Sequence, residues 1–255
     1  MRKFVKRHLY GSLGYFRYFD IRVYFPRKSW SFRAACEQGI FESENVRLLQ
    51  SLVKPDSWLF DVGTNIGLMS APVLKSIDGV RVLSFEPSPN VVDYLQRTIA
   101  GSRYGDQWTL VKKAVGRTVG TVQFSLSSQE LSLFDGIRPT KRVPMSRQVQ
   151  VELTTIDVEW KNLKEPEVSM IKIDIEGGEL DALYGALECI ARNKPAILIE
   201  WNRDNLAAYC IPHDAILDFS KEFGYRIFSV PGMVQVTDPV ELSLHMIETE
   251  SFLLR

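Results

Sequence analysis

Short apolar runs alternate with longer amphipathic segments from residue 58 onward. This pattern is typical of parallel strands joined by helices. The runs predicted to form strands are Trp58 to Val62, Val80 to Phe85, Trp108 to Val115, Met170 to Ile175, Ala196 to Ile199 and Tyr225 to Val230. The pattern therefore predicts an α/β fold with a mostly parallel sheet and helices on both faces.

Four segments depart from this alternation. Thr121 to Leu126 and Val149 to Ile156 show period-two alternation, which predicts an antiparallel pair. The polar stretch between them, Ser127 to Gln148, is long enough to be a lid, a binding loop or an irregular solvated loop. The final run, Ser251 to Arg255, follows the sixth strand without an obvious crossover helix, so we predict that it is antiparallel to its neighbour.

The composition, 45% apolar and 24% charged over 255 residues, excludes disordered and fibrous classes. We assign residues 1–50 to an N-terminal extension and residues 51–255 to one large domain. No run reaches the ~18 apolar residues of a membrane span, and no apolar segment follows the basic start. We therefore expect no membrane helix and no signal peptide. We expect the protein to be cytoplasmic.

The net charge of zero hides an asymmetry at the N-terminus. Residues 1–28 hold eight basic side chains against Asp20 alone, together with eight aromatic ones. This extension could meet anionic lipid heads at a membrane surface, or it could pack its rings on the domain and leave its charges in water. We expect no nucleic-acid partner, because the basic residues form no continuous track along the chain.

The loop after the first predicted strand carries candidate chemistry, since ligands of open α/β sheets bind at the carboxyl ends of strands. It runs from Asp61 to Gly67, and the second strand ends at Glu86, whose carboxylate can accept bonds from ribose hydroxyls. A dinucleotide fingerprint needs glycine where Asn65 and Leu68 stand, which disfavours an NAD-dependent oxidoreductase. Asp61 instead suits a ligand with ammonium and sulfonium groups, such as S-adenosylmethionine.

Five motifs in order resemble the FkbM family of S-adenosylmethionine-dependent methyltransferases. They are Phe60 to Gly67, Phe85 to Pro89, Lys113 to Gly116, Thr155 to Asp157, and Ile171 to Leu180. The resemblance implies a Rossmann-like class I methyltransferase with a seven-stranded sheet whose last strand is antiparallel. It also implies O-methylation of a hydroxyl on a sugar, a glycan or a related natural product.

The resemblance also implies roles for single residues. The methionine part of the cofactor would be cradled by Asp61, Gly63, Asn65 and Gly67, the ribose would be held by Glu86, adenine would be flanked by Lys113 and Ala114, and the ammonium would face Asp174. Many family members have a His two residues after the Glu that ends the fifth strand, whereas this chain reads Glu200-Trp201-Asn202. A catalytic role for that His is thus not available here.

Methyl transfer to a hydroxyl needs a base or a divalent metal that lowers the pKa of the alcohol. We expect Glu200 or Glu176 to be the base and Asp174 to be mainly a cofactor contact. A Mg²⁺ ion held by these three carboxylates is the less favoured alternative. Glu176 and Glu179 could instead cap a helix.

The acceptor is not named by any motif. The basic residues of the long loop suggest a cationic lid over an anionic or phosphate-linked acceptor: Arg138, Lys141, Arg142 and Arg147. A lipid-linked acceptor is a further candidate. A catalytically inactive nucleoside-binding module at a membrane or a glycan assembly is the alternative function.

Overall fold

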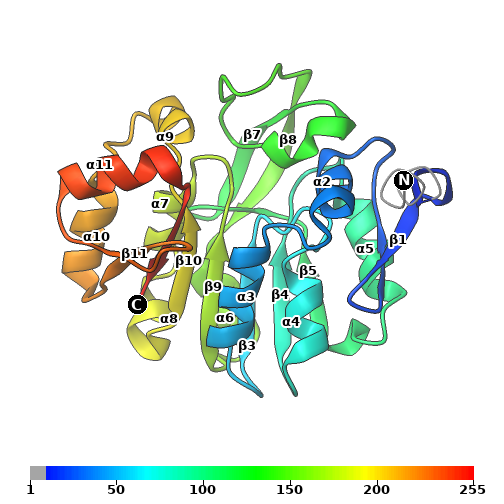
Figure 1. The fold of residues 1–255 in the computed structure, drawn as a ribbon, viewed down its shortest axis with the longest axis horizontal. Coiled ribbons are helices and arrows are strands. Elements are labelled where there is room, and N and C mark those ends of the chain that lie inside the picture. The colour runs from blue at the N-terminus through cyan, green and yellow to red at the C-terminus, as the bar shows by residue number, and fades with distance from the viewer. Residues whose placement is uncertain (1–9) are drawn as a thin grey trace.

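The computed structural model describes residues 10–255. The basic residues Arg2, Lys3, Lys6 and Arg7 of the predicted extension lie outside the described residues. The centre of the protein is an eight-stranded sheet in the order β12-β11-β13-β10-β9-β3-β4-β5, with helices on both sides (Figure 1). Its strands are β3 (Trp58–Val62), β4 (Arg81–Phe85), β5 (Trp108–Val111), β9 (Val168–Ile173), β10 (Ala196–Glu200), β11 (Ile227–Ser229), β12 (Gln235–Val236) and β13 (Ser251–Leu254).

The five central strands, β10, β9, β3, β4 and β5, are mutually parallel. The last strand, β13, is inserted between β10 and β11 and is antiparallel to both, which confirms the predicted direction. The predicted α/β class is therefore correct. The sheet has eight strands instead of the predicted seven because the two-residue β12 adds an edge beside β11.

The helices lie before and between the strands of this sheet in the chain. They are α2 (Trp30–Gln38), α3 (Ser43–Leu52), α4 (Ser70–Ser76), α5 (Val92–Ala100), α6 (Ile156–Asn162), α7 (Glu179–Tyr184), α8 (Leu187–Asn193), α9 (Arg203–Tyr209), α10 (Ala215–Phe223) and α11 (Pro239–Glu248). The prediction that no helix precedes the last strand is wrong, since α11 does. Its start is capped by Asp238, but three exposed apolar residues blur its amphipathic pattern: Val240, Leu244 and Ile247.

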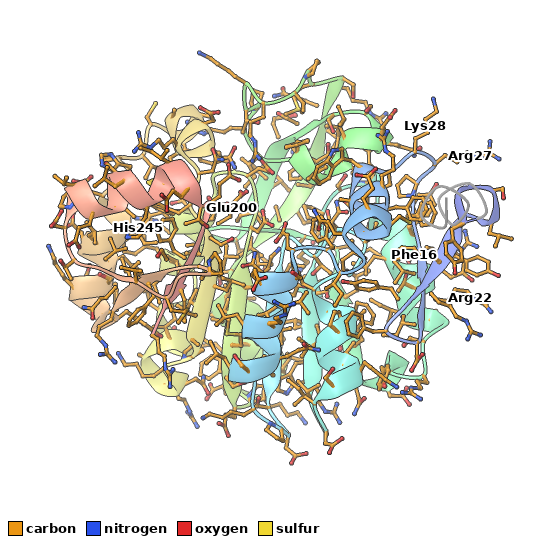
Figure 2. The ribbon with its side chains drawn as sticks, in the orientation of Figure 1. Phe16, Arg22, Arg27, Lys28, Glu200 and His245 are labelled. Carbon is orange, nitrogen blue, oxygen red and sulfur yellow. The ribbon has the colours of Figure 1, made fainter. Side chains whose placement is uncertain are left out.

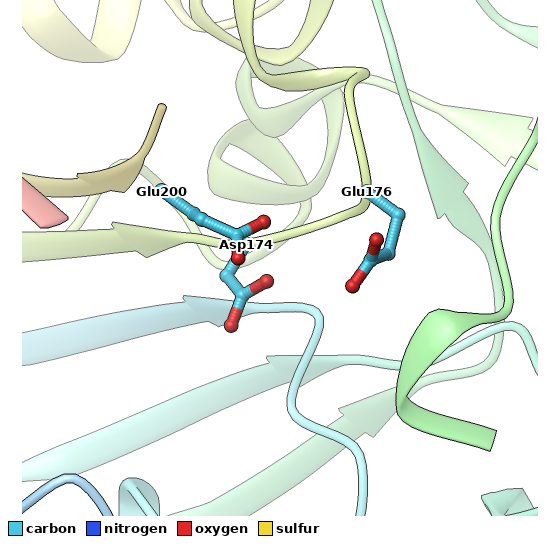
Figure 3. Close-up of side chains that lie close together, drawn as sticks. All are labelled: Asp174, Glu176 and Glu200. Atoms are coloured by element: carbon cyan, nitrogen blue, oxygen red, sulfur yellow. The ribbon is translucent and has the colours of Figure 1, made fainter. Parts of the chain in front are cut away.

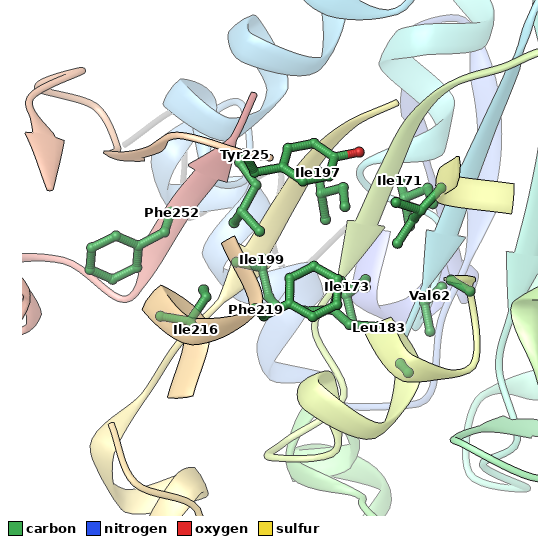
Figure 4. Packing of buried hydrophobic residues seen from close by; sticks show 14 of the residues in the cluster. Val62, Ile171, Ile173, Leu183, Ile197, Ile199, Ile216, Phe219, Tyr225 and Phe252 are labelled. Atoms are coloured by element: carbon green, nitrogen blue, oxygen red, sulfur yellow. The ribbon is translucent and has the colours of Figure 1, made fainter. Parts of the chain in front are cut away.

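Alternate residues of each central strand face two different apolar cores, as expected for a sheet covered on both sides. On one face Phe60, Ile171 and Ile199 pack against α6, α7, α8 and α10. Figure 4 shows Ile173 and Ile199 of this cluster beside Phe219 and Leu183. On the other face Leu59 and neighbouring strand residues pack against α3, α4 and α5. The two layers fix the carboxyl ends of the strands at one rim of the molecule.

An antiparallel hairpin of β1 (Tyr15–Tyr18) and β2 (Ile21–Tyr24) precedes these layers. Its inward side chains, such as Phe16 and Val23, are buried in the second core. Its outward side chains include the exposed Arg17 and Arg22, which stand opposite each other in the register. Figure 2 shows Arg22 on the outer side of this end of the molecule. The boundary at residue 50 stays a prediction.

A second sheet carries the long loop. It contains β6 (Ala114–Val115), β8 (Arg147–Thr154) and β7 (Gly120–Leu126), and the predicted antiparallel pairing of β7 with β8 is confirmed. The loop between them forms the short 3-10 helix η2 (Gln129–Phe134). The buried Asp135 anchors it by accepting bonds from the Ser88 hydroxyl at 2.6 Å and the Asn90 amide at 2.9 Å. The loop is thus a packed part of the structure.

Candidate active site

One cavity opens at the carboxyl ends of the central strands and encloses about 1300 Å³ of empty space, including its mouth. The space within it that water can occupy is about 270 Å³, close to the lower end of the ~300–1,000 Å³ that small-molecule pockets commonly hold. It brings together most of the predicted site residues: Gly63, Asn65, Glu86, Lys113, Ala114, Asp174, Glu176 and Glu200. Asp61 and Gly67 do not line it; they lie behind the cavity wall.

Packing within the protein explains the two glycines of the loop after β3. Both have left-handed backbones, with φ of 81° at Gly63 and 91° at Gly67. A Cβ on Gly63 would lie 1.8 Å from the carbonyl oxygen of Asp174, and one on Gly67 would lie 2.8 Å from the Trp108 ring. The glycines therefore allow the loop to pack against β9 and β5, which places Asn65 at the cavity.

Glu86 closes this loop from the end of β4. Its carboxylate accepts backbone bonds from Asn65 and Ser88, each at 2.8 Å. Burial raises the pKa of Glu86 to about 7, although the two backbone bonds favour the ionised form. Two carboxylate oxygens offer about four lone-pair sites, so capacity remains for hydroxyl groups of a bound ribose.

A buried ion-paired group stands beneath the loop. Asp61 is fully buried, accepts a 2.5 Å bond from Ser70, and has its other oxygen 3.7 Å from the Lys172 ammonium. Lys172 also donates to the Gly63 carbonyl at 3.0 Å and lies 3.2 Å from Asp174. Burial alone would lower the pKa of Lys172, but the Asp174 and Asp61 carboxylates raise it. Lys172 therefore stays charged, and from β9 it binds both Asp61 of β3 and the backbone of the loop after β3.

Our sequence reasoning did not select Lys172. The signal was a single charge inside the otherwise apolar strand from Met170 to Ile173. A charged residue at such a position is almost never fully buried unless it is paired.

Three carboxylates gather at the ends of β9 and β10. Asp174, Glu176 and Glu200 each offer an oxygen within 4.8 Å of the others, and Figure 3 shows their side chains converging. Burial and the charge of Asp174 raise the pKa of Glu176 to about 8. The same causes, with Glu176 added, raise the pKa of Glu200 well above its usual range. Their altered acidity is typical of groups that exchange protons.

Arg142 from the long loop reaches this cluster. Its guanidinium lies 3.2 Å from Glu176, 3.6 Å from Glu200 and 3.6 Å from Glu250. The predicted loop cation thus meets carboxylates of the protein itself. Glu250, just before β13, was not selected from the sequence because 50 residues separate it from Glu200.

The candidate acids differ in what they contact. Glu179 accepts backbone bonds from Ile175 and Gly177, each at 3.0 Å, and so stabilises the turn before α7. Glu200 has one oxygen held by the Asn205 amide at 3.0 Å, while the other lies beyond hydrogen-bond distance of Arg142. Of these two, only Glu200 lines the cavity, which it does from the end of β10.

The three clustered carboxylates are oxygen donors of the kind that hard cations prefer. Arg142 already places a positive charge beside two of them. The prediction that no metal is held here is not tested by these contacts.

Comparison with known proteins adds an independent observation. Residues 61–227 match the profile of the methyltransferase FkbM domain, which is more than half of the chain. The chain belongs to the FkbM methyltransferase family. It is an S-adenosylmethionine-dependent methyltransferase, and the resemblance inferred from its motifs is confirmed. This assignment leaves the oxidoreductase and inactive-module alternatives without support.

Two relatives are more specific in name. The chain is 23% identical over 189 residues to the 2-O-methyltransferase NoeI of Sinorhizobium fredii, covering 69% of this chain and 76% of that protein. It is 25% identical over 151 residues to the hexuronic acid methyltransferase AglP of Haloferax volcanii, covering 56% of each. The chain therefore spans little more than half of AglP.

Among solved structures, an FkbM methyltransferase from Methylobacillus flagellatus aligns with a TM-score of 0.49 at 15% identity. The alignment covers 89% of this chain and 61% of that one. Within residues 10–255, no helix is long and apolar enough to cross a membrane.

The cavity residues of this FkbM protein fit S-adenosylmethionine. Asp174 keeps 32% of its side chain exposed while it is paired with Lys172, so it can also accept a bond from an ammonium group. Glu86 is a buried carboxylate at the same cavity. A cofactor with an ammonium group and ribose hydroxyls supplies the donors that these two carboxylate acceptors need.

Proposed function

We propose that this protein transfers a methyl group from S-adenosylmethionine to a hydroxyl of a sugar or a glycan. The proposal is supported by the names of the two relatives, one a 2-O-methyltransferase and the other a hexuronic acid methyltransferase. The observation that carries it is the pair of raised-pKa carboxylates, Glu176 and Glu200, on the wall of the cavity.

The order of the strands separates two parts of the cavity. The proposed cofactor contacts Gly63, Asn65 and Glu86 follow β3 and β4, and Lys113 and Ala114 follow β5. Glu176 and Glu200 follow β9 and β10 on the other side. We assign the acceptor to this second side, where the carboxylates can reach its hydroxyl.

In the proposed contacts, Glu86 accepts bonds from the ribose hydroxyls of the cofactor and Asp174 accepts a bond from its ammonium group. Lys113 and Ala114 flank the adenine ring, and Gly63 and Asn65 contact the methionine part. Asp61 and Gly67 support this surface from behind, since neither lines the cavity. Bound S-adenosylmethionine supplies the electrophilic methyl carbon.

Glu200 is the proposed base. Its carboxylate accepts the proton of the acceptor hydroxyl as the O–C bond forms and the S–C bond breaks. One oxygen of Glu200 is oriented by Asn205, which leaves the other for the acceptor. The pKa of Glu200, raised by burial, makes it a stronger base than an ordinary carboxylate. Glu176 holds Arg142 beside it and adjusts the charge of the site.

A lipid-linked acceptor at a membrane surface is a finer part of this proposal. It is supported by the outer face of the β1–β2 hairpin, where Arg17 and Arg22 are exposed and lie opposite each other across the strands. Arg97 lies 4.3 Å over the Tyr24 ring on the same side. Like charges opposite each other are unfavourable in isolation and become favourable against an anionic surface.

The test is transfer of labelled methyl from S-adenosylmethionine to a panel of sugars, with the wild type compared with Glu200→Gln. We expect turnover to fall by roughly 10²–10⁴-fold, because a positioned base contributes about this much. Affinity for S-adenosylhomocysteine, measured by calorimetry, should change by less than about twofold. The control is Glu222→Gln, which removes the same charge from an exposed position of α10. Unchanged turnover in Glu200→Gln removes Glu200 from the chemistry.

A further inference from the structure

The charge of the cavity bears on which sugars it accepts. Seven carboxylates and three cations line it: Glu42, Glu86, Asp135, Asp174, Glu176, Glu200 and Glu250, against Lys113, Arg142 and Lys172. Glu86 and Asp135 make hydrogen bonds on the cofactor side. Of the other five, Asp174 is the proposed contact of the cofactor ammonium. The remaining four, Glu42, Glu176, Glu200 and Glu250, stand on the side that we assign to the acceptor.

Each described cation in the cavity wall already faces more than one carboxylate. Arg142 lies within 3.6 Å of Glu176, Glu200 and Glu250. Lys172 is held between Asp61 and Asp174. An incoming carboxylate or phosphate would therefore have to compete with acids of the protein for either cation.

Lys113 is the third cation and lies on the cofactor side. It is 3.5 Å from both Glu152 and Glu159. It is thus also shared between two acids, and it follows β5, away from Glu200. The wall offers an anionic acceptor no uncommitted positive group among its described side chains.

A neighbouring pocket extends the same acidic surface. It is lined by Glu42, Asp174, Glu200, Glu248 and Glu250, with Lys172 as its basic residue. An acceptor that reaches Glu200 through this side also passes carboxylates. The base must lose its proton before it can act, so the reacting state of the site is more negative still.

We propose that the acceptor ring is a sugar without a negative charge near the reacting hydroxyl, and that uronic acids and phosphorylated rings are rejected. The inference rests on the proposed function and narrows it. It places this chain nearer to a hydroxyl methyltransferase of neutral sugars than to an enzyme for hexuronic acids. Juxtaposed like charges give such discrimination, because their repulsion disfavours the charged acceptor relative to the neutral one.

The experiment compares neutral hexosides with the matching uronosides on the same aglycone, so that CH₂OH and COO⁻ differ alone. Labelled S-adenosylmethionine is the methyl donor, and kcat/KM is measured for each pair at low salt and at ~0.5 M salt. We expect the neutral member to be better by at least about tenfold at low salt, and the ratio to shrink at high salt because salt screens repulsion between charges that solvent reaches.

Two variants of the same cluster should move this ratio in opposite directions. Glu250→Gln leaves Arg142 with one carboxylate fewer beside it. The ratio of kcat/KM for the neutral sugar to kcat/KM for the uronoside should then fall about threefold or more. Arg142→Gln removes the cation and should raise this ratio. General damage to the site cannot produce opposite shifts. The matched control Glu222→Gln should leave the ratio as it is.

Equal kcat/KM for both members of a pair, or a preference for the uronoside, overturns this inference while the proposed function stands. Methylation of neither sugar, with S-adenosylhomocysteine still bound, overturns the proposed function and this inference with it.

Discussion

Replacing Lys172 by Met tests how the buried charges hold the cofactor loop. The Lys172 side chain is 7% exposed and that of Asp61 is 0% exposed, so solvent screens their attraction very little. One oxygen of Asp61 has no hydrogen-bond partner and has Lys172 as its ion-pair partner at 3.7 Å. Lys172→Met thus leaves a buried charge with one bond, from Ser70.

Breaking a buried ion pair by removing one partner costs about 3–5 kcal/mol. We expect the free energy of unfolding in urea to fall by this amount. For a chain of this size the midpoint of thermal unfolding should drop by roughly 6–20 °C, at about 2–4 °C per kcal/mol. The affinity for S-adenosylhomocysteine should also fall by about tenfold or more, since Lys172 donates to Gly63 and pairs with Asp174.

Two comparisons make this test specific. Lys54→Met breaks an exposed pair with Glu167, whose side chains are 66% and 63% exposed, and should cost less than about 1 kcal/mol. The double variant Asp61→Asn with Lys172→Met removes both charges and should recover at least about half of the loss. The reasoning would be refuted if the free energy of unfolding fell no further in Lys172→Met than in Lys54→Met.

Three further predictions follow from the same cavity. Burial raises the pKa of Glu86 to about 7, and the ionised form of its carboxylate binds the ribose hydroxyls. Affinity for S-adenosylhomocysteine should therefore fall as the pH is lowered through about 7, by up to tenfold per pH unit. Calorimetry across pH checks this, and Glu86→Gln should show a weaker affinity without this dependence. Turnover should rise with pH as the carboxylate cluster loses its proton, with Glu176 titrating at about 8, which a pH–rate profile measures. Gly67→Ala should cost about 2–4 kcal/mol of stability in urea, because its φ is 91° and the Trp108 ring lies 2.8 Å from the added Cβ.

Each of these has an opposing outcome. A pH-independent affinity in the wild type shows that Glu86 does not bind as the anion. A turnover that falls as pH rises toward 8 excludes a carboxylate base. For Gly67→Ala the control is Gly39→Ala, which has a φ of 85° and no neighbour within 4 Å. If the two variants lose the same stability in urea, the contact with the Trp108 ring does not account for the effect of Gly67→Ala.

Local sequence patterns were sufficient for the centre of the sheet. The buried runs that end at Val62, Phe85 and Glu200 are strands because each is short and mostly apolar. Since parallel strands end at one rim, the residues after them were expected to converge, and Asp174, Glu176 and Glu200 do. The antiparallel last strand was predicted for a partly mistaken reason, because α11 precedes it.

The long-range partners were beyond such reasoning. Arg142 meets Glu176 and Glu250 across 34 and more residues, through a loop whose path is set by the buried Asp135 network. No periodicity encodes that path. The loop charge suggested an anionic acceptor, whereas the structure pairs Arg142 with acids of the protein.

The roles of the two loop glycines show a similar limit. The family resemblance implied that Gly63 and Gly67 contact the methionine part of the cofactor. In the structure a Cβ on either would meet protein atoms instead, the Asp174 carbonyl and the Trp108 ring. The glycine pattern indicates that another group contacts the backbone closely at these positions. It does not distinguish a ligand from other atoms of the protein.

The most direct test of the central claim is to locate the transferred methyl. S-adenosylmethionine with a ¹³C-methyl group is incubated with the protein and a mixture of neutral and uronic-acid glycans, and the labelled products are examined by NMR. We predict a methyl ether on a ring hydroxyl of a neutral sugar, stable to mild alkali, which is lost in Glu200→Gln. Label found in an alkali-labile methyl ester, or on no sugar while S-adenosylhomocysteine binds, would contradict the account.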